Sequence, residues 1–247
     1  MDIYFPKTAR GLIPVVLFVH GGAWIQGDKT EGAGIEDIPA LVDAGFAVAA
    51  VNYRLAPEYK FPAMIEDVKS AVRFLRSVAS DYGLDPNKIG AYGGSAGGHL
   101  VSLLGVTDVS AGWDNGTNAE YSSRVQAVVD MFGPANLALV FPPNAPINPY
   151  NVFGTNDPRH PILTSASPTT WATSDDPPFL ILHGDQDSVV PLAQSQQLYK
   201  SLINAGIEAQ LIVVKNGGHG WRNSPNMEPT RDEITQMIVR FFNTHLQ

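Results

Sequence analysis

The chain has 247 residues, 44% of them hydrophobic and 16% charged, which is ordinary for a globular protein and argues against a disordered or fibrous chain. Lys and Arg number 16 against 24 Asp and Glu, a formal charge of −8, so the chain lacks the basic surface that nucleic-acid binding needs. There is no cysteine, which excludes disulfides, thiolate metal sites and cysteine nucleophiles together.

Short runs rich in Val, Ile, Leu and Phe alternate with segments of helical period, which indicates βα units around a mostly parallel sheet. The predicted strands, in chain order, are Asp2–Phe5 at an edge, Val15–Val19, Phe46–Asn52, Lys88–Tyr92, Val125–Met131, Phe179–Leu182 and Gln210–Val214. The predicted helices are Ile35–Asp43, Met64–Ala79 with an end near Gly83, Ala96–Leu104, Pro191–Ala205 and Arg231–His245.

Two segments break this alternation, Thr107–Arg124 and the proline-rich Gly133–Pro178. Long irregular segments in a compact domain are often functional, so residues 133–178 are predicted to be a loop or lid-like insertion. The alternative is a surface excursion with no role. Since no repeat or linker interrupts the chain, residues 1–247 are expected to form a single α/β domain.

The longest strongly apolar run, Ile13–Val19, is far shorter than the ~20 residues of a membrane span. The first residues, Met1–Arg10, lack the pattern of a secretion signal. We therefore expect no membrane association, and a cytoplasmic location for the chain as given, or secretion if its N-terminus has been removed. Nothing in the pattern indicates an oligomeric state.

The strongest local motif is Gly93-Gly94-Ser95-Ala96-Gly97, placed between a predicted strand and a predicted helix. This is the G-x-S-x-G pattern in the context that a nucleophile needs, because a sharp strand-to-helix turn exposes the serine hydroxyl. We therefore predict that Ser95 is a nucleophile and that the Ala96 N–H faces the oxyanion formed there. The alternative is a glycine-rich turn with an ordinary N-cap serine.

A second motif, His20-Gly21-Gly22-Ala23-Trp24, follows the predicted strand Val15–Val19. Ester hydrolysis builds negative charge on the carbonyl oxygen, and N–H groups that already point there stabilise it. By analogy with HGGG-type loops, the oxyanion hole is predicted to comprise the N–H groups of Gly22 and Ala23 together with Ala96. Ala23 replaces a glycine, which fits this geometry if its φ is negative. His20 is expected to be structural.

The remaining chemistry lies in His183–Pro191 and in Gly217–Trp221, each after a predicted strand, where functional groups collect in doubly wound sheets. The chain order Ser, Asp, His required by a G-x-S-x-G elbow leaves His219 and His245 as the base. His245, in a terminal amphipathic helix, is interpreted as a surface residue, so His219 is predicted to be the base. Two carboxylates, Asp185 and Asp187, remain open as the acid.

No H-E-x-x-H or comparable cluster occurs, so neither a catalytic metal nor a cofactor is predicted. Trp24 and Trp221 neighbour the predicted catalytic loops and are candidates to bind substrate. The alternative for both is packing in the core, which is the commoner role of aromatic side chains.

With these residues in view, the chain resembles the α/β-hydrolase superfamily, and within it hormone-sensitive-lipase-like esterases, from about Ile3 to its end. The stretch Asn52–Glu58 followed by Phe61-Pro62-Ala63 is similar to a characteristic stretch of that group. Three further stretches resemble more specifically the bacterial family of bifunctional acetylxylan and feruloyl esterases. They are the motif His20–Trp24, Gly27-Asp28-Lys29 and Gly93–Leu100. The chain starts at what would be that fold's second strand.

The resemblance implies an α/β-hydrolase fold, a mostly parallel doubly wound sheet with helices on both faces. It also implies hydrolysis of acetyl or feruloyl esters on plant polysaccharide without a cofactor. The H-G-x-x-D-x-V-V-P pattern of these families assigns the acid to Asp187 rather than Asp185.

The expected function is therefore that of a serine esterase acting on short-chain esters through Ser95, His219 and Asp187. Short acyl groups are expected because no long apolar cap helix is visible. One alternative is arylformamidase-like amide hydrolysis, which uses the same residues. Another is a non-catalytic ligand-binding protein on a hydrolase scaffold, which we would expect to have lost a triad member.

Overall fold

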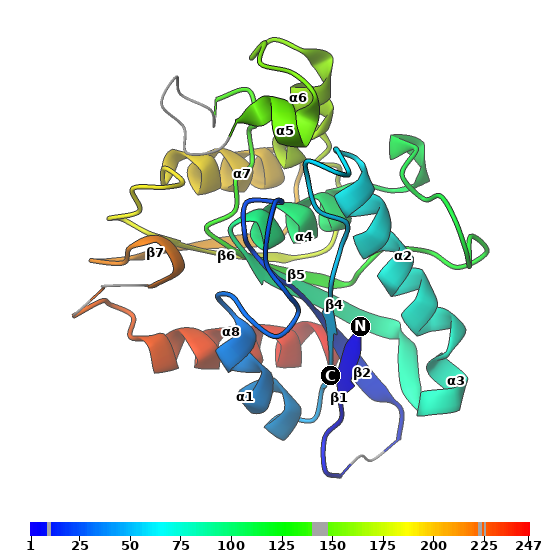
Figure 1. Ribbon diagram of the computed structural model, residues 1–247. Coiled ribbons are helices and arrows are strands. Elements are labelled where there is room, and N and C mark those ends of the chain that lie inside the picture. Colours follow the sequence, from blue (N-terminus) through cyan, green and yellow to red (C-terminus); the bar gives the residue numbers. More distant parts are fainter. Residues whose placement is uncertain (9–10, 140–147, 222–223, 225) are drawn as a thin grey trace.

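The computed structural model describes residues 1–8, 11–139, 148–221, 224 and 226–247. Its centre is a seven-stranded sheet in the order β1-β3-β2-β4-β5-β6-β7 (Figure 1). β1 runs antiparallel to β3, and the other neighbouring strands are parallel. The predicted strands are thereby confirmed, with the bounds β1 Asp2–Tyr4, β2 Ile13–Val19, β3 Ala47–Val51, β4 Leu84–Gly94, β5 Ala127–Met131, β6 Phe179–Gly184 and β7 Ala209–Val214.

Helices cover both faces of the sheet, with α2, α4 and α7 on one face and α1 and α8 on the other (Figure 1). This is the doubly wound arrangement predicted from the sequence. The α-helices are α1 Ile38–Asp43, α2 Ala63–Ser77, α3 Ala79–Tyr82, α4 Ala96–Val106, α5 Pro149–Phe153, α6 Pro161–Ser165, α7 Ala193–Asn204 and α8 Arg231–Leu246. Single 3₁₀ turns are η1 Ile35–Asp37, η2 Val109–Ala111, η3 Pro168–Thr170 and η4 His219–Trp221.

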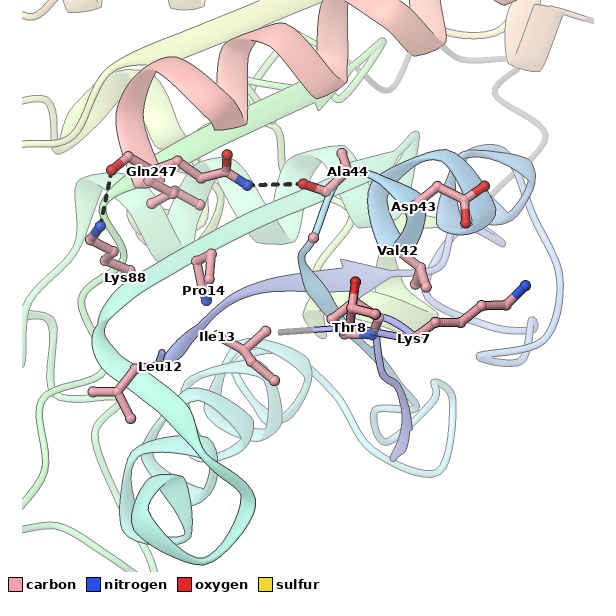
Figure 2. Close-up of a pocket in the computed structure, with 13 residues that line it drawn as sticks. Lys7, Thr8, Leu12, Ile13, Pro14, Val42, Asp43, Ala44, Lys88 and Gln247 are labelled. Atoms are coloured by element: carbon pink, nitrogen blue, oxygen red, sulfur yellow. Dashed lines mark hydrogen bonds between the residues drawn. The ribbon is translucent and has the colours of Figure 1, made fainter. Parts of the chain in front are cut away.

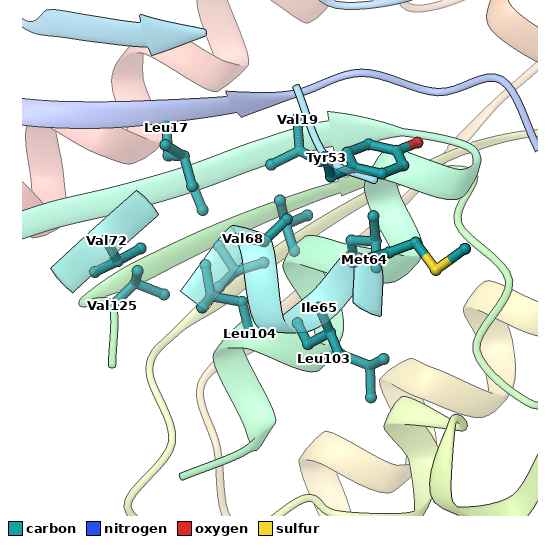
Figure 3. Packing of buried hydrophobic residues seen from close by; sticks show 14 of the residues in the cluster. Leu17, Val19, Tyr53, Met64, Ile65, Val68, Val72, Leu103, Leu104 and Val125 are labelled. Atoms are coloured by element: carbon teal, nitrogen blue, oxygen red, sulfur yellow. The ribbon is translucent and has the colours of Figure 1, made fainter. Parts of the chain in front are cut away.

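The central strands read as continuous apolar runs because both of their faces are buried. Successive side chains of β2 alternate between two clusters: Leu17 and Val19 join the one under α2 and α4, whereas Val16 and Phe18 join the one under α1 and α8. Figure 3 shows the first cluster, in which Leu17 and Val19 face Val68 of α2.

The segment 133–178 is less irregular than its composition predicts. Its described parts contain α5, α6 and η3, none longer than 5 residues and therefore too short to show a helical period in the sequence. Leu137, Val152 and Leu163 belong to the main hydrophobic core. Residues 140–147 lie outside the described residues, so the predicted lid stays a prediction.

Helix α8 begins with a reciprocal capping box between Thr230 and Glu233. Its first turn is tied to η1, because the Arg231 guanidinium donates to Asp37 Oδ1 over 2.7 Å. At its other end His245, predicted to be a surface residue, is half-buried. The His245 side chain is 16% exposed, because α8 packs against the sheet and the ring lies against Phe241.

A cavity of about 820 Å³ opens at the amino ends of β2 and β4 (Figure 2). Lys88 Nζ donates to the Gln247 backbone oxygen over 3.1 Å, and Gln247 Nε2 donates to Ala44 O over 3.0 Å. The parallel strands carry the predicted catalytic motifs at their other ends, so this cavity is remote from them. None of the helices in the described ranges combines the length and the hydrophobicity of a membrane span.

We expect Gly105→Ala to lower the free energy of unfolding by about 1–3 kcal/mol, although alanine favours a helix interior by ~1 kcal/mol. A Cβ at Gly105 of α4 would lie 2.6 Å from the Phe179 ring and 2.8 Å from Val128 Cγ2, both fixed in the core. Denaturant unfolding measures the change. Gln196→Ala, on the exposed side of α7, is the control and should stay within about 0.5 kcal/mol of the wild type. A variant as stable as the wild type would mean that α4 can move off the sheet.

Candidate active site

Three side chains that the sequence predicted separately meet at the carboxyl edge of the sheet. Ser95 follows β4, Asp187 follows β6 and His219 follows β7. His219 Nε2 is 3.0 Å from Ser95 Oγ, and His219 Nδ1 is 2.7 Å from Asp187 Oδ2. The Asp187 side chain is fully buried, whereas Asp185, the other candidate acid, is exposed.

Ser95 lies in a strained backbone conformation, with φ 58° and ψ −121°. Such a conformation costs a non-glycine residue about 1–3 kcal/mol and persists only where the surroundings enforce it. Here the Ser95 N–H donates to Met131 O of β5 over 2.9 Å, and the Ser95 carbonyl accepts the His99 N–H over 2.9 Å. The elbow is therefore held by the neighbouring strand on one side and by α4 on the other.

The loop His20–Trp24 packs backbone against backbone on this elbow. A Cβ at Gly93 would lie 2.5 Å from the Val19 carbonyl oxygen, and one at Gly21 would lie 2.9 Å from the Gly94 carbonyl oxygen. Only glycine allows these approaches. In the part of the chain that the structure describes, the N–H groups of Gly22, Ala23 and Ala96 donate to no protein acceptor, which leaves them available to a ligand.

The condition set on Ala23, a negative φ, is not met. Its φ is 57°, and that of Trp24 is 62°. The Ile25 N–H donates to Gly22 O over 3.1 Å, so Ala23 and Trp24 are the central residues of a β-turn. Positive φ at both positions belongs to a type I′ turn, which reverses the chain within two residues.

Asn52 and Tyr53 hold this loop and the residues that follow it. The Tyr53 hydroxyl donates to His20 O over 3.1 Å, and Asn52 Nδ2 donates to Asp28 Oδ2 over 2.8 Å. The His20 ring is 1% exposed and stacks on Tyr53 with 4.3 Å between ring centroids, which agrees with the structural role expected of it. The motif after β3 thus supports the loop after β2.

The Asp187 carboxylate collects hydrogen bonds on both oxygens. Oδ1 accepts the N–H groups of Val189 and Val190 over 2.8 Å each, and Oδ2 lies 3.4 Å from His183 Nε2 as well as against His219. Burial by itself would raise the pKa of this carboxyl, but the hydrogen bonds from His183 and His219 outweigh it and hold the pKa well below its usual value. Asp187 is therefore ionised at neutral pH.

His183 supports the acid, a role that the sequence did not assign to it. Its Nε2 is 2.9 Å from Val190 O, which can only accept, so Nε2 carries the hydrogen. Its Nδ1 then accepts the Ser195 hydroxyl over 2.6 Å. Both side chains are fully buried, so this Ser–His contact holds the Asp187 turn and cannot meet a substrate.

Phe132 is a further residue that the sequence reasoning missed. It directly follows β5, has φ 45°, and its ring lies 4.9 Å from that of His219 and 4.9 Å from that of Trp221. The Phe132 ring thus packs against one side of the His219 imidazole. Its position at a strand's carboxyl end, before Gly133, was the available signal.

Both tryptophans are largely buried, which favours the alternative of core packing, and their contact with substrate stays a prediction. Trp24 is 2% exposed and packs edge-to-face on Phe153 at 5.5 Å, and Trp221 is 8% exposed against Phe132. Both have a positive φ themselves, 62° at Trp24 and 61° at Trp221. Trp24 packs beside the predicted oxyanion hole and Trp221 packs on Phe132, which contacts His219, so both side chains support the geometry of the site.

Two buried titratable groups lie beneath the elbow. Burial raises the pKa of Asp130, whose Oδ1 accepts the Gly133 N–H, to about 6. Burial likewise lowers the pKa of His99, on α4, to about 4. Among the described residues, no group of three or more His, Asp or Glu side chains is placed to hold a metal ion.

A mostly parallel, doubly wound sheet with a strained serine elbow after a central strand, and with an acid and a histidine after later strands, defines an α/β-hydrolase. The family model BD-FAE matches residues 1–202. The chain belongs to the BD-FAE family, as the resemblance at its loops predicted.

Known proteins similar to this chain are esterases. A probable carboxylic ester hydrolase of Mycobacterium tuberculosis, LipM, is 36% identical over 193 residues, which cover 75% of this chain and 44% of that protein. The chain spans about half the length of the curated relatives it matches.

Among solved structures, a truncated carbohydrate esterase from gut microbiota is 34% identical with a TM-score of 0.85, covering 98% of this chain and 89% of that one. An acetyl ester-xyloside bifunctional hydrolase from Caldicellulosiruptor lactoaceticus is 25% identical with a TM-score of 0.81, covering 97% and 86%.

Asp130 and His99 are expected to give opposite pH dependences of stability. The pKa of Asp130 is about 6 in the folded protein and 3.8 in the unfolded chain, so the folded state binds this proton more tightly. Protonation of Asp130 therefore stabilises the fold at low pH, and this stabilisation is lost as pH rises to about 6. The pKa of His99 is about 4 in the folded protein and 6.5 in the unfolded chain, so the unfolded state binds this proton more tightly. The stability that neutral His99 contributes at high pH is therefore lost as pH falls to about 4. Each contribution is on the order of 3 kcal/mol.

Urea unfolding between pH 4.5 and 7 tests this. Asp130→Asn should lose stability toward low pH more steeply than the wild type, and His99→Asn less steeply. Parallel curves for all three proteins would mean that these groups do not titrate as stated.

Proposed function

We propose that this protein is a serine esterase that hydrolyses short-chain carboxylic esters, acetyl or feruloyl esters of plant polysaccharide among them. The observation that carries the proposal is the hydrogen-bonded series Ser95–His219–Asp187, with links of 3.0 and 2.7 Å. These distances are within reach of direct proton transfer. The strained backbone of the serine and the free N–H groups beside it add the other parts of an acyl-transfer site.

In this mechanism Ser95 Oγ attacks the ester carbonyl while His219 Nε2 takes its proton. The carbonyl oxygen becomes an oxyanion that accepts hydrogen bonds from the N–H groups of Gly22, Ala23 and Ala96. His219 then gives the proton to the departing alcohol, which leaves an acyl group on Ser95. Water repeats the sequence and releases the acid.

Asp187 has an electrostatic role in each of these steps. Its ionised carboxylate accepts the Nδ1–H of His219, which leaves Nε2 unprotonated and facing Ser95. The same carboxylate stabilises the imidazolium that forms after proton transfer. A buried acid whose pKa stays low keeps this charge over the whole neutral range.

The substrate class rests on the comparisons. A carbohydrate esterase and an acetyl ester-xyloside hydrolase share this fold over almost the whole chain. The aromatic side chains beneath the loop His20–Trp24 are packed against one another, and Trp24 and Phe153, 2% and 5% exposed, offer little apolar surface to a long acyl chain. Both observations favour small acyl groups on a carbohydrate.

We expect p-nitrophenyl acetate and butyrate to be hydrolysed with a kcat/KM at least about tenfold above that of the decanoate, about 1.4 kcal/mol of discrimination. Methyl ferulate, acetylated xylan and N-formylkynurenine complete the panel. Ser95→Ala is the matched control, and its kcat should fall by about 10⁶ while its unfolding curve is unchanged. Hydrolysis of N-formylkynurenine alone would replace the esterase proposal with amide hydrolysis, and activity that survives in Ser95→Ala would remove Ser95 as nucleophile.

The two acids after β6 allow a second, paired test. Asp187→Asn should lower kcat by ~10⁴, because an asparagine can hold His219 in the wrong tautomer. Asp185→Asn makes the same chemical change on an exposed side chain two residues away and should leave kcat within about twofold. Steady-state kinetics on p-nitrophenyl acetate measures both. The reverse ranking would show that the acid is misassigned.

A further inference from the structure

His99 is a fully buried imidazole that the proposed mechanism does not use. Its Nε2 lies 2.7 Å from the carbonyl oxygen of Ala166, and its Nδ1 lies 3.2 Å from the indole Nε1 of Trp24. A carbonyl can only accept and an indole N–H can only donate, so Nε2 carries the hydrogen and Nδ1 is the acceptor. The two partners therefore select one neutral tautomer.

Trp24 directly follows Ala23, one of the predicted oxyanion donors. Its φ of 62° is a costly conformation for a bulky residue, so its surroundings must hold it there. The backbone oxygen accepts the Ala56 N–H over 2.9 Å, which fixes one side of the peptide. The side chain is fixed by His99 and by the edge-to-face contact with Phe153.

We propose that His99 is a positioning residue of the oxyanion hole. By accepting the Trp24 indole N–H, it holds the left-handed turn at residues 23–24 and so aims the Ala23 N–H at the oxyanion. The inference rests on the proposed esterase function.

Because His99 is on α4, its hydrogen bond to Trp24 connects the loop His20–Trp24 to the helix that follows the nucleophile. The same helix begins with Ala96, the third predicted donor, and the His99 N–H closes its first turn on Ser95 O. One rigid element thus presents the nucleophile, supplies one donor, and ties down the loop that supplies the others. Oxyanion donors act over a narrow range of distances, so a small shift of the loop weakens them in the transition state.

The surroundings keep His99 suited to this role. Burial lowers the pKa of its imidazole to about 4, so Nδ1 stays an unprotonated acceptor at neutral pH. Ala166, which orients the other nitrogen, is fully buried at the C-terminal end of α6. The segment 133–178 therefore contributes to the hole through its packing.

A matched pair of tryptophan variants tests the proposal. Trp24→Phe and Trp171→Phe each remove one indole hydrogen bond, to His99 Nδ1 and to Ser165 O, and keep an aromatic ring. On p-nitrophenyl acetate, Trp24→Phe should lower kcat at least about tenfold and leave KM within twofold. The reason is that the oxyanion forms in the transition state and is absent from the bound substrate. Trp171→Phe should change kcat less than twofold.

Two variants of His99 separate positioning from simple stability. His99→Leu and His99→Asn both lose the Ala166 bond, but the Asn oxygen can take the place of Nδ1 as acceptor for Trp24. Both should lose thermal stability to a similar degree, while His99→Asn recovers most of the kcat that His99→Leu loses. The double variant Trp24→Phe/His99→Leu should be no slower than His99→Leu, since both changes break one interaction.

The outcomes distinguish this inference from the function on which it rests. An active wild type in which Trp24→Phe behaves like Trp171→Phe, or in which His99→Asn is as slow as His99→Leu, would overturn the role of His99 alone. A wild type inactive toward every ester would overturn the proposed function, and this role with it.

Discussion

Direct contact between backbones at the carboxyl ends of β2 and β4 is the constraint on which the rest of the site depends. A side chain at Gly93 would meet the Val19 carbonyl, and one at Gly21 would meet the Gly94 carbonyl. Because no side chain separates the two loops, the nucleophile and the N–H groups beside it form one packed unit. Their relative position is then fixed by the register of two central strands, Val19 opposite Gly93.

The strain of this arrangement is concentrated at the site and offset by the core. In the described part of the chain, the non-glycine residues with positive φ other than asparagines are Ala23, Trp24, Ser95, Phe132 and Trp221, all in the loops around the proposed nucleophile and base. Each costs about 1–3 kcal/mol and persists because its surroundings over-determine it. The sheet buried on both faces, together with the aromatic side chains under the loops, supplies that restraint.

Residues outside the catalytic positions hold the loops that carry the proposed catalytic groups. The loop after β6 carries Asp187 and is held by His183, while the loop after β7 carries His219 and rests on Phe132 from β5. On the other side, Asn52 and Tyr53 after β3 hold the loop after β2. The loop after β6 is therefore held by a residue of its own strand, and the loops after β7 and β2 are held by residues that follow other strands of the sheet.

The sequence by itself determined the strands, the helices α1, α2, α4, α7 and α8, and the loops that bear Ser95, Asp187 and His219, because periodicity and glycine-rich motifs are local properties. It did not determine the φ of Ala23, the burial of Trp24 and Trp221, or the roles of His99, His183 and Phe132. Only the tertiary structure decided these, since most of them depend on a partner distant in sequence, as His99 depends on Trp24, 75 residues earlier. The short helices of 133–178 also form only by packing, because 5 residues carry no periodic signal of their own.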